Sequence, residues 1–200
     1  MTANEALNVI KSWLGYSESD GRYRKIIDIY NTQNPLPRGY KVKYDDQWCA
    51  TCISAIGVYL NDTETIKSEC SCYYMIEKYK ASGLFIKDRF RVPKPGDIIF
   101  YDWQSDGIPD HVGIVEKCDG NIIVIIEGNY SDSVRQRSLQ VGNTQIFGYA
   151  TPQYTENISN WAVEYWDKAK AKNICDGTRP KDFATREEII TLLGRCGLLD

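Results

Sequence analysis

The sequence contains a single histidine, His111, and no long apolar run. Any reaction that needs an imidazole must therefore use this residue. No segment is long and apolar enough to predict a membrane-spanning helix, and the first residues, "MTANEALNVIKSWLG", lack the apolar core of a signal peptide. We expect a chain that is made and folded in a cytoplasm, with no membrane partner.

Positive charge is not in excess either. The chain has 24 Lys and Arg against 27 Asp and Glu, a net charge of −3, and no basic block that would neutralise phosphates. These numbers argue against nucleic acid as the main partner. The seven cysteines are an odd number, and without an export signal we expect mostly reduced thiols. The hydrophobic content of 42% is enough for a packed core.

The apolar pattern changes along the chain from a helical to a strand period. A capping box at Thr2 and Glu5 predicts a first helix, and further helices are expected within 19–31, 48–60 and 71–83, the last ending at Gly83. From Val92 onward the pattern predicts a strand within 92–103, a hairpin over 111–129 and a last strand over 145–150. Helices followed by an antiparallel sheet predict an α+β fold.

The stretch "DDQWCATCIS" holds a Cys-x-x-Cys that admits three interpretations. A redox dithiol normally follows an apolar strand, whereas charged and polar residues precede Cys49. A zinc site could add Cys70 and Cys72, but their spacing is too tight for a structural knuckle. Cys52 is more simply a core-facing thiol. The favoured interpretation is that Cys49 is a nucleophile.

A cysteine in the first turn of a helix has its pKa lowered by the helix dipole, and its free N–H can donate to an oxyanion. The base must be His111. A three-residue hairpin loop at 118–120 would pair His111 with Glu127 and place Asn129 on the same face. A histidine flanked by a carboxylate and an amide suits the general base of a cysteine nucleophile.

The segments "WCATCISA", "PKPGDIIFYDW", "DHVGIVEKCDGNIIVIIEGN" and "IFGYATP", in this order, resemble the CHAP family of cysteine, histidine-dependent amidohydrolases/peptidases. The resemblance spans roughly residues 3–152 and implies a papain-like fold, with N-terminal helices packed on an antiparallel sheet. It implies Cys49 as nucleophile, His111 as base and then acid, Glu127 as its orienting residue and Asn129 as an accessory. The implied reaction cleaves an amide of peptidoglycan through a thioester, without a metal or organic cofactor.

The sequence departs from the family beside the nucleophile. Many relatives have Gln directly before the cysteine, whereas here Trp48 intervenes, so Gln47 is only a candidate oxyanion donor. Trp48 is either a packing residue or a wall of the substrate groove. Asp102 and Asp106 resemble part of a calcium loop, but Gly113 stands where its bidentate acid would be, which favours a plain polar loop.

The tail "WAVEYWDKAKAKNICDGTRPKDFATREEIITLLGR" resembles a single S-layer-homology-like motif. We therefore expect a catalytic domain over 1–152, a linker over 153–158 and a small helical module over 159–200. The resemblance implies that the module binds a secondary cell-wall polymer. Oligomerisation is the other expected role, because so short a segment makes only a small core of its own. Its candidate binding residues are Asp176, Gly177 and Arg186.

Together these features favour a phage-type endolysin that acts at the cell wall after release from the host cytoplasm. The N-acetylmuramoyl-L-alanine amidase reaction is preferred over cleavage within the peptide stem or cross-bridge. Two other classes remain: a thiol oxidoreductase that uses Cys49 and Cys52, and a wall-binding protein without activity.

Overall fold

The computed structural model describes residues 1–155, 162–172 and 186–195. Its contacts divide the chain into two compact units, Met1–Tyr154 and Thr155–Asp200. Among the described residues, no helix combines the length and the apolar character needed to cross a bilayer.

Helices dominate the first half of the larger unit, as the apolar pattern predicts. Thr2 and Glu5 form the predicted capping box, and Gly83 lies in the left-handed region just beyond the last of these helices. The helices are α1 (Ala3–Ser12), α2 (Arg24–Asn31), α3 (Cys49–Tyr59) and α4 (Cys72–Ala81), with a short 3-10 helix at Pro37–Gly39.

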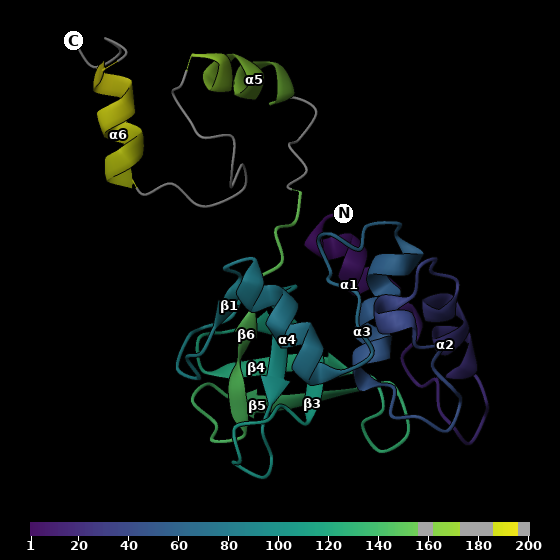
Figure 1. The fold of residues 1–200 in the computed structure, drawn as a ribbon. Helices are drawn as coiled ribbons and strands as arrows, with labels where there is room; N and C mark the ends of the chain where they lie inside the picture. Colours follow the sequence, from purple (N-terminus) through teal and green to yellow (C-terminus); the bar gives the residue numbers. More distant parts are fainter. Residues whose placement is uncertain (156–161, 173–185, 196–200) are drawn as a thin grey trace. The chain divides into compact units, whose positions relative to one another are not determined.

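The second half forms an antiparallel sheet (Figure 1). In the described residues its strand order is β1-β6-β2-β3-β4-β5. The strands are β1 (Phe85–Ile86), β2 (Ile98–Tyr101), β3 (His111–Cys118), β4 (Ile122–Glu127), β5 (Arg135–Gln140) and β6 (Ile146–Ala150). The predicted α+β class is confirmed, and the arrangement is consistent with a papain-like CHAP fold. Strands β1 and β5 were not predicted.

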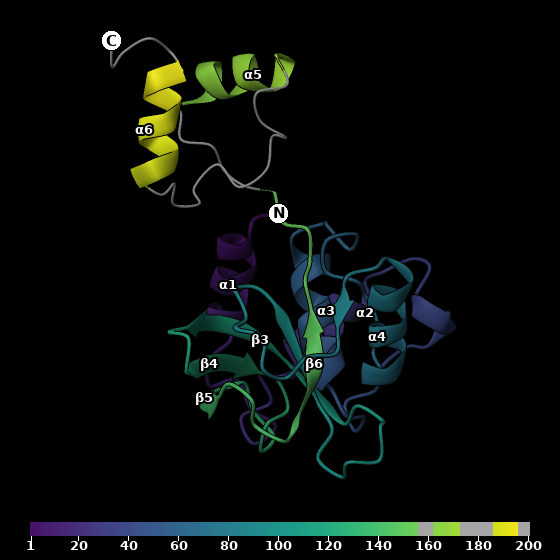
Figure 2. The same cartoon turned by 90° about the vertical axis from the view of Figure 1, so that its left-hand side faces the viewer.

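The helices α2, α3 and α4 lie on one side of the sheet (Figure 2). Helix α3 packs against α1, α2 and the strands β3 and β4, and its residues from Cys49 to Gly57 are all buried. Alternate residues of β2 face the two sides: Ile98 and Phe100 join the core under the helices, while Ile99 and Tyr101 join a smaller core on the other face. The nucleophile candidate thus begins the central helix of the main core.

The smaller unit contains α5 (Val163–Ala171) and α6 (Arg186–Arg195). On α5, Glu164 pairs with Lys168 one turn later, with 2.5 Å between carboxylate and ammonium. Arg186 is the exposed first residue of α6. Asp176 and Gly177 lie outside the described residues, and the predicted roles of this unit remain predictions.

Candidate active site

The β3–β4 hairpin has a register different from the predicted one. The residue opposite Glu127 is Gly113, not His111, and the pairing near the tip is Cys118 with Ile123. Two features cause the difference. The turn is longer than expected, because the Asp119 carboxylate accepts the N–H groups of Asn121 and Ile122, and Glu116 is an extra residue that forms a bulge in β3.

The shift at the site amounts to two residues, so the side chains keep their faces. His111 therefore lies diagonal to Glu127 on the same face, with 3.9 Å between His111 Nε2 and Glu127 Oε1. This distance is longer than a hydrogen bond, and Nε2 has no hydrogen-bond partner within the described part of the chain. A Cβ at Gly113 would lie 2.7 Å from Glu127 Cγ, so a glycine is required opposite this carboxylate.

The fully buried Glu127 has a partner that the sequence reasoning missed. Arg137 on β5 donates from Nε to Oε2 at 2.6 Å and from Nη2 to Oε1 at 3.0 Å. This bidentate pair fixes the plane of the carboxylate. It also supplies the opposite charge that a buried carboxylate requires. A carboxylate at the end of an apolar strand needs a counter-ion, and this need could have pointed to Arg137. The segment "RQR" at 135–137 holds the arginines nearest to Glu127 in sequence.

Cys49 begins α3 as predicted and is 7% exposed. Its sulfur lies 3.6 Å from that of Cys72, the first residue of α4. Hydrogen bonding from Cys72 lowers the pKa of Cys49 well below its usual value, although burial opposes this; the nearby His111 and the Ala50 N–H lower this pKa further. The pKa of Cys72 is raised by the same sulfur contact and by burial, so Cys72 keeps its proton.

Cys52 does not contribute its thiol to this group of residues. Its side chain lies against Gly128, where an added Cβ would come within 2.3 Å of Cys52 Cβ. Burial raises the pKa of the Cys52 thiol, consistent with an inert core cysteine. Among the described residues, no group of three or more His, Cys, Asp and Glu side chains could hold a metal ion, so the zinc set of Cys49, Cys52, Cys70 and Cys72 is not assembled.

Trp48 is fully buried, so it acts as a packing residue and does not line a groove. Its indole N–H donates to Glu18 at 2.9 Å, and its ring lies 5.5 Å from that of Tyr23. Gln47, by contrast, is exposed and accepts a 2.8 Å hydrogen bond from the Asn129 amide through its side-chain oxygen. The structure therefore brings two predicted site residues, Gln47 and Asn129, into contact.

An aromatic neighbourhood surrounds His111. The Trp103 ring stacks on the imidazole with centroids 4.9 Å apart, and Tyr101 and Tyr130 lie at 5.7 and 6.2 Å. Trp103 is 42% exposed, so it covers the imidazole on the solvent side. This residue was also missed, because a single tryptophan in a polar loop gives no sequence signal of its own.

The loop that carries Trp103 is closed by its own carboxylates. Asp110 accepts the Trp103 N–H, and Asp102 accepts the N–H groups of Asp106 and Gly107 at 3.1 and 2.8 Å. Asp106 in turn accepts the Ile108 N–H at 2.9 Å. The two residues considered for calcium, Asp102 and Asp106, thus hold the loop backbone.

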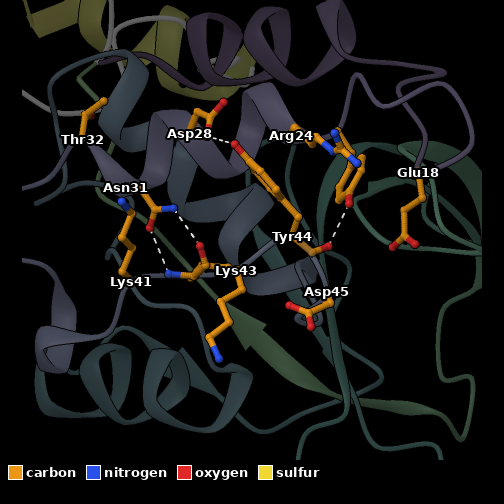
Figure 3. A pocket seen from close by; sticks show the side chains of 11 residues that line it. Glu18, Arg24, Asp28, Asn31, Thr32, Lys41, Lys43, Tyr44 and Asp45 are labelled. Carbon is orange, nitrogen blue, oxygen red and sulfur yellow. Dashed lines mark hydrogen bonds between the residues drawn. The ribbon is translucent and has the colours of Figure 1, made fainter.

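A pocket of about 1030 Å³ lies between α2 and the segment 41–45 (Figure 3). Some of its polar groups bond to one another: Asn31 and the Val42 backbone bond in both directions, at 2.8 and 3.0 Å, and Tyr44 donates to Asp28 at 2.8 Å. None of the described residues that line it belongs to the cysteine–histidine group. These bonds hold the segment that leads to Cys49, which is a structural contribution to the site.

The sulfur, imidazole and carboxylate therefore meet where α3 begins, β3 begins and β4 ends. The arrangement is consistent with the predicted roles of Cys49 as nucleophile and His111 as base. Residues 39–129 match the CHAP domain. The CHAP match contains Cys49, His111, Glu127 and Asn129, together with Gln47.

The solved structures that are similar to the chain include two of Ly7917. The crystal structure of Ly7917 aligns with a TM-score of 0.49 and 20% identity, over 76% of this chain and 62% of that one. The crystal structure of Ly7917 with the hydrolyzing product of MDP aligns with a TM-score of 0.45 and 19% identity, over 76% and 63%. The chain thus spans less than two thirds of the length of these structures. No curated protein matches.

Proposed function

We propose that this protein is a peptidoglycan hydrolase that cleaves an amide bond with Cys49 as nucleophile. The observation that carries the proposal is the meeting of a cysteine of lowered pKa with the chain's only histidine, inside the segment that matches the CHAP domain. In the proposed reaction the Cys49 thiolate attacks the amide carbonyl carbon and forms a tetrahedral oxyanion.

The backbone N–H of Cys49, free at the start of α3, donates to this oxyanion. Gln47 is the proposed side-chain donor. Because Asn129 engages its oxygen, the Gln47 NH2 group is the part left to face the substrate. This contact gives Asn129 its accessory role.

His111, which has taken the proton of the Cys49 thiol, then protonates the leaving amine, and the acyl group remains on Cys49 as a thioester. The same imidazole accepts a proton from the water that hydrolyses the thioester. Glu127 faces His111 Nε2 at 3.9 Å and stabilises the imidazolium while it is charged. Arg137 keeps that carboxylate in place.

The bond that we favour is the N-acetylmuramoyl-L-alanine amide, and an endopeptidase reaction on the stem or cross-bridge is the alternative with the same mechanism. Phage origin as an endolysin is part of the proposal. We further propose that the unit Thr155–Asp200 binds a wall polymer or mediates oligomerisation. Arg186, exposed on α6, is the described residue with which to test it.

The thiol oxidoreductase that uses Cys49 and Cys52 is disfavoured by a specific observation. The sulfur in contact with Cys49 is that of Cys72, while Cys52 packs on Gly128. A reversible Cys49–Cys52 disulfide in the purified protein would instead support the oxidoreductase.

The test is mass spectrometry of purified peptidoglycan after digestion by the wild type, Cys49→Ala and the matched control Cys52→Ala. We expect new ends with the wild type and the control, and none with Cys49→Ala. Free glycan with N-terminal L-alanine stems identifies the amidase, whereas split stems or bridges identify the endopeptidase. A folded, reduced wild type that produces no new ends from several wall types would overturn the proposal.

A further inference from the structure

Two buried thiols are in contact, although they belong to the first residues of two helices that are far apart in sequence. Cys49 begins α3, Cys72 begins α4, and their sulfurs are 3.6 Å apart. Each is only 7% exposed. A disulfide needs a sulfur–sulfur separation of about 2.05 Å, so side-chain rotation and a small shift would bring the two atoms to bonding distance.

The two thiols have unequal chemistry. Cys49 is held toward the thiolate by the hydrogen bond from Cys72 and by His111, whereas Cys72 stays protonated. Oxidation by peroxide attacks the thiolate first, and the outcome depends on whether a second thiol is next to the resulting sulfenic acid. Here that second thiol is in contact with the nucleophile.

We propose that Cys49 and Cys72 form a reversible redox pair, in which peroxide converts the nucleophile to a disulfide and a thiol reductant restores it. In the first step the Cys49 thiolate takes one oxygen from hydrogen peroxide and becomes a sulfenic acid, releasing hydroxide. In the second step the Cys72 sulfur attacks the Cys49 sulfur, an S–S bond forms and the S–O bond breaks. The oxygen leaves as water, which carries the proton of the Cys72 thiol. The two thiols lose two electrons, and the peroxide gains them.

This site is distinct from the Cys-x-x-Cys motif. Cys52 is also buried, but its side chain lies on Gly128, whereas the sulfur of Cys72 lies 3.6 Å from that of Cys49. Cys72 is thus the resolving residue. Its effect would be protective, because a sulfenic acid without a resolving thiol proceeds to sulfinic and sulfonic acids that thiol reductants do not reverse.

The consequence for activity rests on the proposed function, since Cys49 in a disulfide cannot attack an amide. The chemistry of the pair does not rest on it, because peptide mapping reads the oxidation state whether or not any wall is cleaved. A protein that forms the Cys49–Cys72 link but never releases wall ends would refute the proposed hydrolase alone.

The experiment treats reduced wild type, Cys72→Ala and the matched control Cys52→Ala with hydrogen peroxide until equal fractions of Cys49 are oxidised. Free thiols are then alkylated and the peptides are mapped by mass spectrometry. We expect a Cys49–Cys72 linked peptide in wild type and Cys52→Ala, and sulfinic or sulfonic Cys49 in Cys72→Ala. Dithiothreitol should return the first two proteins to their own starting activity on cell walls and leave Cys72→Ala inactivated.

A Cys49–Cys52 link in the wild type would overturn the proposal, as would over-oxidation of wild-type Cys49 to the same extent as in Cys72→Ala. Circular dichroism confirms that each variant is folded. If Cys72→Ala does not fold, the near-isosteric Cys72→Ser takes its place, and the wild-type map alone still decides which cysteine is the partner.

Discussion

The backbone of Gly128 lies against the side chain of Cys52, so closely that a Cβ at position 128 would be 2.6 Å from Cys52 Sγ and 3.1 Å from Trp48 Cζ3. Helix α3 carries Cys49 at its start, and Gly128 directly follows Glu127 on β4. This contact therefore sets the distance between the element that carries the nucleophile and the element that carries the acid of the site.

Gly128→Ala is expected to push α3 away from β4. We predict a loss of roughly 1–3 kcal/mol in the free energy of unfolding, the usual cost of overpacking, together with a large loss of wall-lytic activity. Urea denaturation and the turbidity of a cell-wall suspension measure the two effects. Cys52→Ala is the control and should retain activity.

The double variant Cys52→Ala/Gly128→Ala sharpens this prediction. Alanine keeps the Cβ of Cys52, which is the atom 2.3 Å from the position of the new Cβ, so the second change should not rescue the first. Recovery of activity in the double variant would show that the sulfur alone sets the helix position.

Arg137→Met should destabilise the protein by roughly 3–5 kcal/mol, because it leaves the fully buried Glu127 without its partner. The neutral pair Glu127→Gln/Arg137→Met should be more stable than Arg137→Met alone, since no unpaired charge remains. Chemical denaturation of the wild type, the single variants Glu127→Gln and Arg137→Met, and the double variant gives the coupling between the two sites. A single variant within about 0.5 kcal/mol of wild type would show that the ion pair is not needed.

Trp103→Ala should lower activity with little change in stability, because this side chain is 42% exposed and its main contact is the stack on His111. We expect a decrease of roughly tenfold, equivalent to the ~1.4 kcal/mol that a good aromatic contact can supply. Trp103→Phe keeps a ring at this position and should retain most of the activity. Equal losses in both variants would assign the effect to the indole N–H or to the loop.

The lowered pKa of Cys49 predicts its reactivity toward iodoacetamide. Thiolate is lost only as the pH falls through the pKa, so alkylation of Cys49 should stay fast below pH ~8.5, where a free cysteine becomes mostly thiol. His111→Ala removes a cause of the lowering and should move the midpoint of the rate profile upward. Mass spectrometry of the Cys49 peptide separates it from the other thiols, and an unchanged midpoint would contradict the role of His111.

The fold class and the shared face of His111 and Glu127 could be predicted because they depend on short-range patterns, whereas the approach of Cys49 to His111 was inferred from the presence of a single histidine and from the family resemblance. The helical period places Cys49 at a helix start, and the alternation of a strand fixes which side chains share a face. The predicted register of the β3–β4 hairpin was wrong, because the Asp119 turn and the Glu116 bulge each depend on local hydrogen bonding that the apolar periodicity does not reveal.

Arg137, Trp103 and Cys72 could not be assigned because each reaches the site through tertiary packing. Cys72 was considered as a zinc ligand, since spacing along the chain says nothing about the approach of two helix starts. Trp48 had two interpretations in sequence, and only its complete burial distinguishes between them.

The bulge at Glu116 has a practical consequence. It separates the pairing at the tip of the hairpin from the pairing of Gly113 with Glu127, so a label at the tip that leaves the Asp119 turn intact should not move the carboxylate. Residues 119–121 are exposed and lie at the opposite end of β3 from His111. A fluorophore or immobilisation tag attached there would report on the protein, or fix it to a support, while the reacting groups remain as they are.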